Sequence, residues 1–262
     1  MKIIAAQLAD VAHAAGAAIL ELRGQALGAW LKEPGQLVTL ADRRSHEIIQ
    51  RELGRRFPGV TQILEEQDNP EVLPACYLTA DELDGTAIYA SGFPEWGVTL
   101  ALIEDGQPVA GVLHQPVLGT TVTAWRGGGT WVDGSRVRLS PRAALASSIA
   151  MLELNRFLNP DHVAWVGRVA HQALAGITQA TAVGNTIALL RGQAAVYLNC
   201  RGAKVWDFAA AALAVAEAGG VVLAADGGGI DWLRLPVGAL LAANPSVAAE
   251  VLALRDGLPG PA

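Results

Sequence analysis

Three acidic side chains crowd into four positions of this chain, directly after an apolar run. The local sequence is CYLTADELDGT, in which Asp81, Glu82 and Asp84 follow a segment with the composition of a buried strand. Like charges at this density repel one another, and a buried carboxylate is costly unless a cation or a proton neutralises it. Any fold of this chain therefore has to provide a counter-charge at the end of that strand.

Bulk properties narrow the class of protein. The chain has 262 residues, 52% of them hydrophobic, and a formal net charge of -6. This acidic balance argues against nucleic-acid binding, which requires a basic surface. Asp10 interrupts the N-terminal apolar stretch, and polar residues interrupt the run 172–190, so we expect neither a signal peptide nor a membrane span. Two cysteines without CxxC spacing predict a cytoplasmic protein without a thiolate metal site.

The hydrophobic pattern predicts an α+β protein. Three- and four-residue spacing predicts helices over 3–22, 40–57, 185–191 and 206–218, with a turn at 33–36. Short apolar runs predict strands near 61–66, 76–80, 194–198 and 240–243. A change of pattern near 140–150 divides the chain into an N-terminal half, 1–145, and a C-terminal half, 146–262.

Two hairpins are expected in the middle of the chain. The segment 98–114 is interrupted at Asp105-Gly106, a strong hairpin signal. The segment 120–134 has three glycines, Gly127–Gly129, at its centre. Three glycines could cradle a phosphate, but no strand-to-helix context follows them, so a plain hairpin turn is the expected role.

Acidic residues follow apolar runs at four places, namely Glu65-Glu66, Asp81, Asp84 and Asp207. Carboxylates without His or Cys suit hard cations, above all Mg²⁺. The Leu83 carbonyl lies between two of these acids and offers a further oxygen. Gly85 and Thr86 then present backbone N–H groups at the start of a short helix, where an anion can bind. Cations beside an anion site indicate phosphate chemistry.

Simpler interpretations compete with this one. Asp84 and Asp207 could each be a helix N-cap, and Glu65-Glu66 could lie on a solvated surface. The haloacid dehalogenase-like phosphatases have a nucleophile motif D-x-D-G-T, whereas this chain reads D-E-L-D-G-T. Acids three apart on an extended strand do not share a face, so that arrangement fails on spacing. No G-x-S-x-G elbow for a serine hydrolase is present.

Taken together, the motifs resemble the inositol monophosphatase family of lithium-sensitive, magnesium-dependent phosphatases. That family carries G-E-E, D-P-[IL]-D-G-T and W-D-x-A-A followed by E-A-G-G. This chain reads LEE at 64–66, DELDGT at 81–86 and WDFAAAALAVAEAGG at 206–220. The segments LVTLAD (37–42) and 111–140 are also similar to family segments. The resemblance covers nearly the whole chain and implies a layered αβαβα sandwich of the inositol monophosphatase/fructose-1,6-bisphosphatase type, usually a homodimer.

The resemblance also implies roles for individual residues, which are carried over position by position. Two or three Mg²⁺ ions would be held by Glu65, Asp81, the Leu83 carbonyl, Asp84 and Asp207. Asp42, Glu65 and Thr86 would act on the attacking water. Phosphate would bind the N–H groups of Gly85 and Thr86, with Lys32 nearby.

Three departures from the family pattern concern the substrate and the metals. Glu82 replaces the family's proline, Leu64 replaces a glycine, and Cys200 stands where inositol-cleaving members carry a glutamate. Arg201 and Lys204 could favour a second phosphate. The expected function is Mg²⁺-dependent hydrolysis of a small phosphomonoester, such as inositol monophosphate or a related sugar phosphate. The alternatives are a 3'(2'),5'-bisphosphate nucleotidase and a catalytically weakened protein that binds metal or phosphate.

Overall fold

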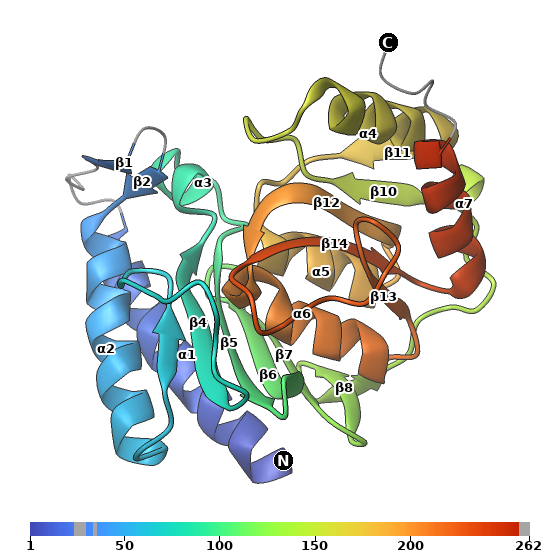
Figure 1. Ribbon diagram of the computed structural model, residues 1–262. Helices are drawn as coiled ribbons and strands as arrows, with labels where there is room; N and C mark the ends of the chain where they lie inside the picture. The colour runs from blue at the N-terminus through green and yellow to red at the C-terminus, as the bar shows by residue number, and fades with distance from the viewer. Residues whose placement is uncertain (24–29, 34–35, 257–262) are drawn as a thin grey trace.

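The computed structural model describes residues 1–23, 30–33 and 36–256, with only the backbone described at 30–33, 36, 37 and 256 (Figure 1). The helices are α1 (Lys2–Leu22), α2 (Leu40–Arg56), α3 (Thr86–Ala90), α4 (Pro160–Gln172), α5 (Ala182–Leu190), α6 (Val205–Glu217) and α7 (Pro245–Asp256), with a 3-10 turn at Leu145–Ser147.

The strands form two large sheets and one small hairpin. The seven-stranded sheet has the order β3-β4-β5-β6-β7-β8-β9 and contains β3 (Gln62–Leu64), β4 (Tyr77–Asp84), β5 (Gly97–Glu104), β6 (Gln107–Gln115), β7 (Thr120–Trp125), β8 (Gly129–Val132) and β9 (Ser135–Val137). The five-stranded sheet has the order β11-β10-β12-β14-β13 and contains β10 (Ile149–Leu152), β11 (Ala175–Ile177), β12 (Ala194–Lys204), β13 (Val221–Ala224) and β14 (Pro236–Ala242). The hairpin pairs β1 (Trp30–Glu33) with β2 (Gln36–Val38).

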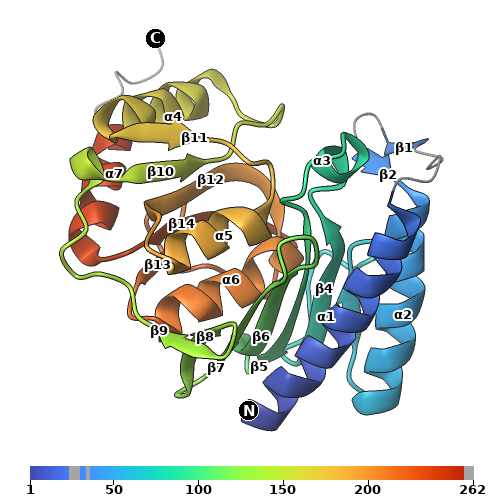
Figure 2. The ribbon, with the colours of Figure 1, turned by 180° about the vertical axis from the view of Figure 1, so that it is seen from behind.

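These elements stack in five layers, as expected for an αβαβα sandwich. Helices α1 and α2 lie side by side on the outer face of the seven-stranded sheet (Figures 1 and 2). Helices α5 and α6 fill the space between the two sheets. Helices α4 and α7 cover the outer face of the five-stranded sheet. Each of the three helix layers packs on its sheet or sheets through its own apolar cluster, so the α+β sandwich prediction is confirmed.

The first helix shows how the sequence pattern produces a layer. The buried residues of α1 include Leu8, Ala12, Ala15 and Ile19, which recur every three or four positions and face α2 and the sheet. By length and composition alone, α1 is long and apolar enough to cross a membrane. In this structure its apolar stripe packs on β5, β6 and β7, which is the environment of a core helix.

Most predicted elements are present, and the differences lie at their ends. The strand expected at 76–80 continues to Asp84, and the strand expected at 194–198 continues to Lys204. The helix expected from Asn185 begins three residues earlier, because Thr181 caps it by accepting the N–H of Gly184. The hairpin at Asp105-Gly106 is confirmed. Pro34 and Gly35, at the centre of the turn expected at 33–36, lie outside the described residues.

The three glycines have a structural role. Gly127 and Gly129 each donate a backbone N–H to the carboxylate of Glu217, at 2.8 and 2.9 Å. Glu217 is the last residue of α6, so the middle helix layer holds the turn between β7 and β8. The expected plain hairpin is confirmed.

All strands of the seven-stranded sheet lie between residues 62 and 137, and those of the five-stranded sheet between 149 and 242. Helix α6 nevertheless packs on β4, β5, β6 and β7 of the first sheet as well as on β14 of the second. The division into halves at residue 145 stays a prediction.

Close packing between α6 and β6 depends on a glycine. A Cβ atom at Gly111 would lie 2.9 Å from the Cα and Cβ atoms of Ala210. We expect Gly111→Ala to lower the free energy of unfolding by about 1–3 kcal/mol, the range for overpacking in a dense core. Urea unfolding followed by circular dichroism measures this loss.

Gly167→Ala is the matched control. Gly167 lies inside α4, and a Cβ atom there would meet nothing within 4 Å. Alanine is the better helix former, so this variant should be more stable than the wild type by about 0.5–1 kcal/mol. Equal stability changes in the two variants would contradict the packing argument.

Candidate active site

The predicted acidic residues gather at the end of β4, where the strand contains a bulge. Asp81 pairs with Thr99 and Asp84 with Gly97, so β4 has one more residue than β5 between these two pairs. In a regular strand, residues three apart point to opposite faces, but an extra residue re-aims the side chains. Carboxylate oxygens of Asp81, Asp84 and Asp207 therefore come within 4.8 Å of one another.

Asp84 is held by a helix distant in the sequence. Its carboxylate accepts a hydrogen bond from the Thr181 hydroxyl and from the backbone N–H groups of Ala182 (3.0 Å) and Val183 (2.7 Å). These groups form the start of α5, whose N-terminal amides have no partner within the helix. The alternative that Asp84 caps the helix that follows it is wrong, because Gly85 is the N-cap of α3 and Asp84 binds α5.

Asp207 and Asp42 occupy equivalent positions at the starts of two other helices. Each is the third residue of its helix, and each carboxylate accepts the backbone N–H at the N-cap: Asp207 from Lys204 at 2.6 Å, and Asp42 from Thr39 at 2.7 Å. The Thr39 hydroxyl also donates to Asp42, at 2.5 Å. This capping box explains the sequence LVTLAD. The alternative of an N-cap at Asp207 is wrong by position, since it sits three residues inside the N-cap.

Thr86 and Asp42 form a pair beside the acidic cluster. The Thr86 hydroxyl donates to Asp42 Oδ1 at 2.9 Å and lies 3.1 Å from the Leu83 carbonyl. Asp42 lies on α2, in the outer helix layer, and Thr86 begins α3. The fold thus brings together two residues that the sequence analysis assigned to the same task.

Glu65 completes a second group around Asp81. It follows the short edge strand β3, which pairs in parallel with β4. Ligand atoms of Glu65, Asp81 and Glu82 lie within 4.8 Å of one another. Asp81 therefore belongs to two acidic groups, one with Glu65 and one with Asp84 and Asp207.

Burial strongly perturbs these acids. It raises the pKa of Glu65 and of Asp81 well above the usual range, and neighbouring carboxylates raise both further. Burial also raises the pKa of Asp207 to about 7 and that of Asp42 to about 6. The pKa of Asp81 is raised by burial and by the charges of Glu65, Asp84 and Asp207, so the cluster favours either bound protons or a bound cation.

This donor set fits a hard divalent cation. It consists of buried carboxylate oxygens with the Leu83 carbonyl nearby. Among the described residues, neither of the two acidic groups around Asp81 contains a His or a Cys, so oxygen is the only ligand type that they offer.

The acids face a cavity of about 480 Å³ whose polar wall also includes the loop at the start of α3. It is lined by Glu65, Gln67, Asp68, Asn69, Asp81, Leu83, Asp84, Gly85, Thr86, Ala87, Phe157, Ala180, Gly202, Lys204, Trp206, Asp207 and Leu235. Most of the predicted site residues thus line one cavity.

Of the predicted residues outside this lining, Asp42 contacts Thr86, whereas Lys32 and Arg201 are placed less directly. Lys32 lies on β1, whose partner β2 packs near α3, but its side chain lies outside the described residues. Arg201 is exposed, and the residues lining the cavity include Lys204 but not Arg201. Both assignments stay predictions.

An adjoining cavity of about 200 Å³ contains residues that the sequence analysis missed, above all Glu153 and Asn199. Glu153 follows the apolar strand β10, the same pattern that identified the other acids, so this signal could have found it. Burial, with the charges of Asp84 and Asp207, raises its pKa to about 7. Cys200 instead faces a separate cavity beside Trp165, so of these two neighbours on β12 it is Asn199 that lines the cavity next to the active site.

The layered αβαβα sandwich and the carboxylate cluster agree with the class of phosphatases that the sequence motifs resemble. The model of the inositol monophosphatase family matches residues 2–256, and the chain belongs to this family of phosphatases. An inositol-1-monophosphatase of Mesorhizobium japonicum is 31% identical over 202 residues, 76% of each chain. A histidinol-phosphatase of Mycobacterium tuberculosis is 31% identical over 198 residues, 72% of this chain and 75% of the relative.

A solved structure supports the fold. An IMPase/NADP phosphatase complexed with Mg²⁺ and phosphate has a TM-score of 0.84 and 20% identity, over 99% of this chain and 95% of that chain. At this identity the likeness shows the fold alone.

The acidic cluster makes a prediction about pH. A buried carboxyl whose pKa is raised on folding keeps its proton where the unfolded chain has lost it, so stability falls as pH rises through that window. For Asp207 the window runs from its ordinary 3.8 to about 7. We expect the melting temperature of the metal-free protein to fall between about pH 4 and pH 7.

Mg²⁺ should restore the lost stability, because a bound cation displaces the protons that the buried carboxyls otherwise retain. Scanning calorimetry with EDTA or with Mg²⁺, across this pH range, measures both effects. The stabilisation by Mg²⁺ should be larger at pH 8 than at pH 5. A stabilisation independent of pH would contradict the assignment of these acids as ligands.

Proposed function

We propose that this chain is a Mg²⁺-dependent phosphomonoesterase that hydrolyses a small phosphorylated metabolite by direct attack of water. The observation that carries the proposal is the position of Asp81, which is shared by two acidic groups and which lines one cavity together with Glu65, Asp84 and Asp207. Glu65, Asp81 and the Leu83 carbonyl would hold one ion, and Asp81, Asp84 and Asp207 a second, with two or three ions in all. When bound, the ions would supply Lewis-acid stabilisation of the phosphoryl group and lower the pKa of water.

The protein's own groups would position the reactants. The Thr86 hydroxyl donates a hydrogen bond to Asp42, so the lone pairs of its oxygen are free to orient a water molecule. Thr86 would take the proton of that water while passing its own hydroxyl proton to the Asp42 carboxylate. Glu65 would contact the same water. The backbone N–H groups of Gly85 and Thr86 would bind the phosphate oxygens, with Lys32 nearby.

The smaller cavity would receive the leaving group. Its lining includes Glu153 and Asn199, and none of the described residues that line it is a lysine or arginine. Such a wall suits hydroxyl-bearing or cationic groups better than a second phosphate. We therefore propose inositol monophosphate or a related sugar phosphate as substrate. A bisphosphate nucleotide remains the alternative, because Lys204 lines the main cavity and Arg201 lies close by in the sequence.

We also propose a cytoplasmic homodimer. Large apolar side chains are exposed around the edge of the five-stranded sheet, among them Leu154, Leu174 and Ile177. A second copy of this chain would cover them. Both cysteines, Cys76 and Cys200, are unpaired, which suits a reducing compartment.

The first test concerns Thr86. Thr86→Ala should lower kcat for Mg²⁺-dependent phosphate release by roughly 10²-fold, the scale for losing help with proton transfer. KM should change less, because the backbone N–H survives. Thr86→Ser should retain most of the activity. Trapping of a covalent phosphate on Asp81 would contradict direct attack by water and favour the haloacid dehalogenase-like alternative.

The second test concerns the substrate. Phosphate release is measured with Mg²⁺ on inositol monophosphate, histidinol phosphate and adenosine 3',5'-bisphosphate. Wild-type turnover of a monoester supports an enzyme, whereas metal binding without turnover of any ester supports the weakened binding protein. Glu153→Gln should lower kcat/KM for the preferred monoester by about tenfold or more, since a buried polar contact is lost.

Arg201→Ala is the matched variant on the exposed side of β12. If a bisphosphate is the substrate, it should raise KM for the bisphosphate far more than for a monophosphate. Equal effects on both would leave Arg201 as a surface residue and return the monoesters to first place.

A further inference from the structure

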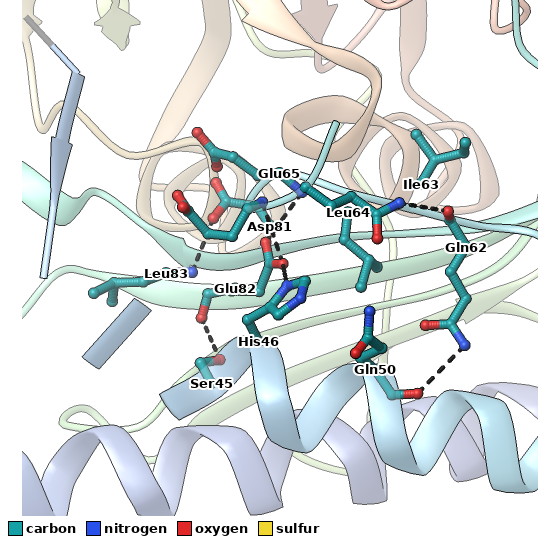
Figure 3. A network of polar contacts seen from close by, with 12 residues as sticks. Ser45, His46, Gln50, Gln62, Ile63, Leu64, Glu65, Asp81, Glu82 and Leu83 are labelled. Atoms are coloured by element: carbon teal, nitrogen blue, oxygen red, sulfur yellow. Dashed lines mark hydrogen bonds and ion pairs between the residues drawn. The ribbon is translucent and has the colours of Figure 1, made fainter. Parts of the chain in front are cut away.

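Glu82 stands at the one position of the DELDGT motif that departs from the family pattern. Its neighbours Asp81 and Leu83 were assigned to the metals, but its own side chain had no role. Glu82 is fully buried, and its side chain is directed toward α2, where it meets His46 (Figure 3). A buried carboxylate requires partners, so its contacts indicate its function.

Both carboxylate oxygens of Glu82 are engaged. Oε1 lies 2.7 Å from His46 Nδ1. The backbone N–H of Glu65 donates to Oε2 at 3.2 Å, and that of Glu66 lies 3.4 Å from Oε1. The Ser45 hydroxyl donates to the backbone carbonyl of Glu82 at 2.7 Å, a contact that does not involve the carboxylate.

The turn after β3 depends on these contacts. β3 is three residues long, lies at the edge of the sheet and pairs only with β4 among the described strands. The turn that follows begins with Glu65, which the proposed function assigns to the metals. The backbone N–H of Glu65 also lies 3.2 Å from the Ala80 carbonyl, so two acceptors of β4 share it.

We propose that Glu82 and His46 form a positioning pair, which holds the backbone of the Glu65-Glu66 turn so that the Glu65 carboxylate is presented to the divalent cation. This inference rests on the proposed function, because it takes Glu65 as a metal ligand. The pair acts through another residue, as outer-shell hydrogen bonds do at metal sites. A proline at position 82, as in the family pattern, has no side-chain oxygen that could accept the Glu65 and Glu66 amides. The positioning role would therefore be specific to chains with an acceptor at this position.

Direct coordination is the competing role for Glu82. One of its oxygens lies within 4.8 Å of ligand atoms of Glu65 and Asp81. The imidazole and the two backbone N–H groups already occupy both oxygens, so the geometry favours positioning. The two roles differ in the number of ions that a Glu82 variant would bind.

The test compares Glu82→Gln with Ser45→Ala in the full chain. Glutamine keeps the shape of Glu82 but lacks the charge and one acceptor oxygen. Ser45→Ala removes a buried hydrogen bond at the same junction of α2 and β4 without touching the carboxylate. Three quantities are measured: amide hydrogen exchange at Glu65 and Glu66 in metal-free protein by NMR, Mg²⁺ binding by calorimetry, and half-activating Mg²⁺ for phosphate release.

For Glu82→Gln we expect faster exchange of both amides, about tenfold or more weaker Mg²⁺ binding and unchanged stoichiometry. The half-activating Mg²⁺ concentration should rise by the same factor, while kcat at saturating Mg²⁺ changes little. Ser45→Ala should change none of these quantities, whatever it does to the melting temperature.

Two results would overturn the proposal. If amide exchange at Glu65 and Glu66 and Mg²⁺ affinity are both unchanged, Glu82 has only a packing role. If the variant binds one ion fewer, Glu82 is a direct metal ligand. If Glu82→Gln does not fold, His46→Leu replaces it, since His46 is partly exposed whereas Glu82 is fully buried. Unchanged amide exchange together with unchanged Mg²⁺ affinity in His46→Leu would overturn the proposal. Absence of turnover in the wild type would refute the proposed function, whereas the exchange measurement would still test the contact.

Discussion

The carboxylates at the end of β4 repel one another, and the elements around them are arranged to offset this repulsion. Three helix starts converge on this point: α5 donates its amides to Asp84, whereas α2 and α6 each carry an acid in their first turn. The positive ends of helix dipoles offset part of the negative charge. They do not neutralise it, since the pKa values of the cluster remain raised. A bound cation would neutralise the charge that the helix starts leave.

Sequence patterns predicted the layers well because each layer repeats a period. The apolar stripe of α1 and the paired strands around Asp105-Gly106 follow directly from spacing. The ends of elements were less predictable. The acids after the apolar run were taken as the end of a strand, yet β4 continues through them to Asp84, because it keeps pairing with β5 as far as Gly97. Tertiary contacts therefore decided where the strand ended.

The convergence of the acidic residues was predicted from the family resemblance, but not from the spacing of the residues alone. A regular strand would separate Asp81 from Asp84, and nothing in the local sequence announces the bulge that joins them. On β12 a second irregularity, between Asn199 and Ala203, includes Gly202 at a φ of 102°. This irregularity decides which side chains of β12 face the active site. For that reason, matching the sequence to the family pattern pointed to Cys200 and did not identify Asn199.

Helix α2 contacts both the end of β4 and the start of α3. Asp42, Ser45 and His46 lie three and four positions apart, so one face of the helix carries all three. Asp42 reaches the hydroxyl of Thr86, Ser45 reaches the backbone of Glu82, and His46 reaches its carboxylate. A glutamate could stand at position 82, where the family pattern has proline, only if α2 also supplied a partner for its charge. Residue 82 and residue 46 should therefore be exchanged together, because proline at 82 alone would remove the carboxylate that contacts the His46 imidazole and the Glu65 and Glu66 amides.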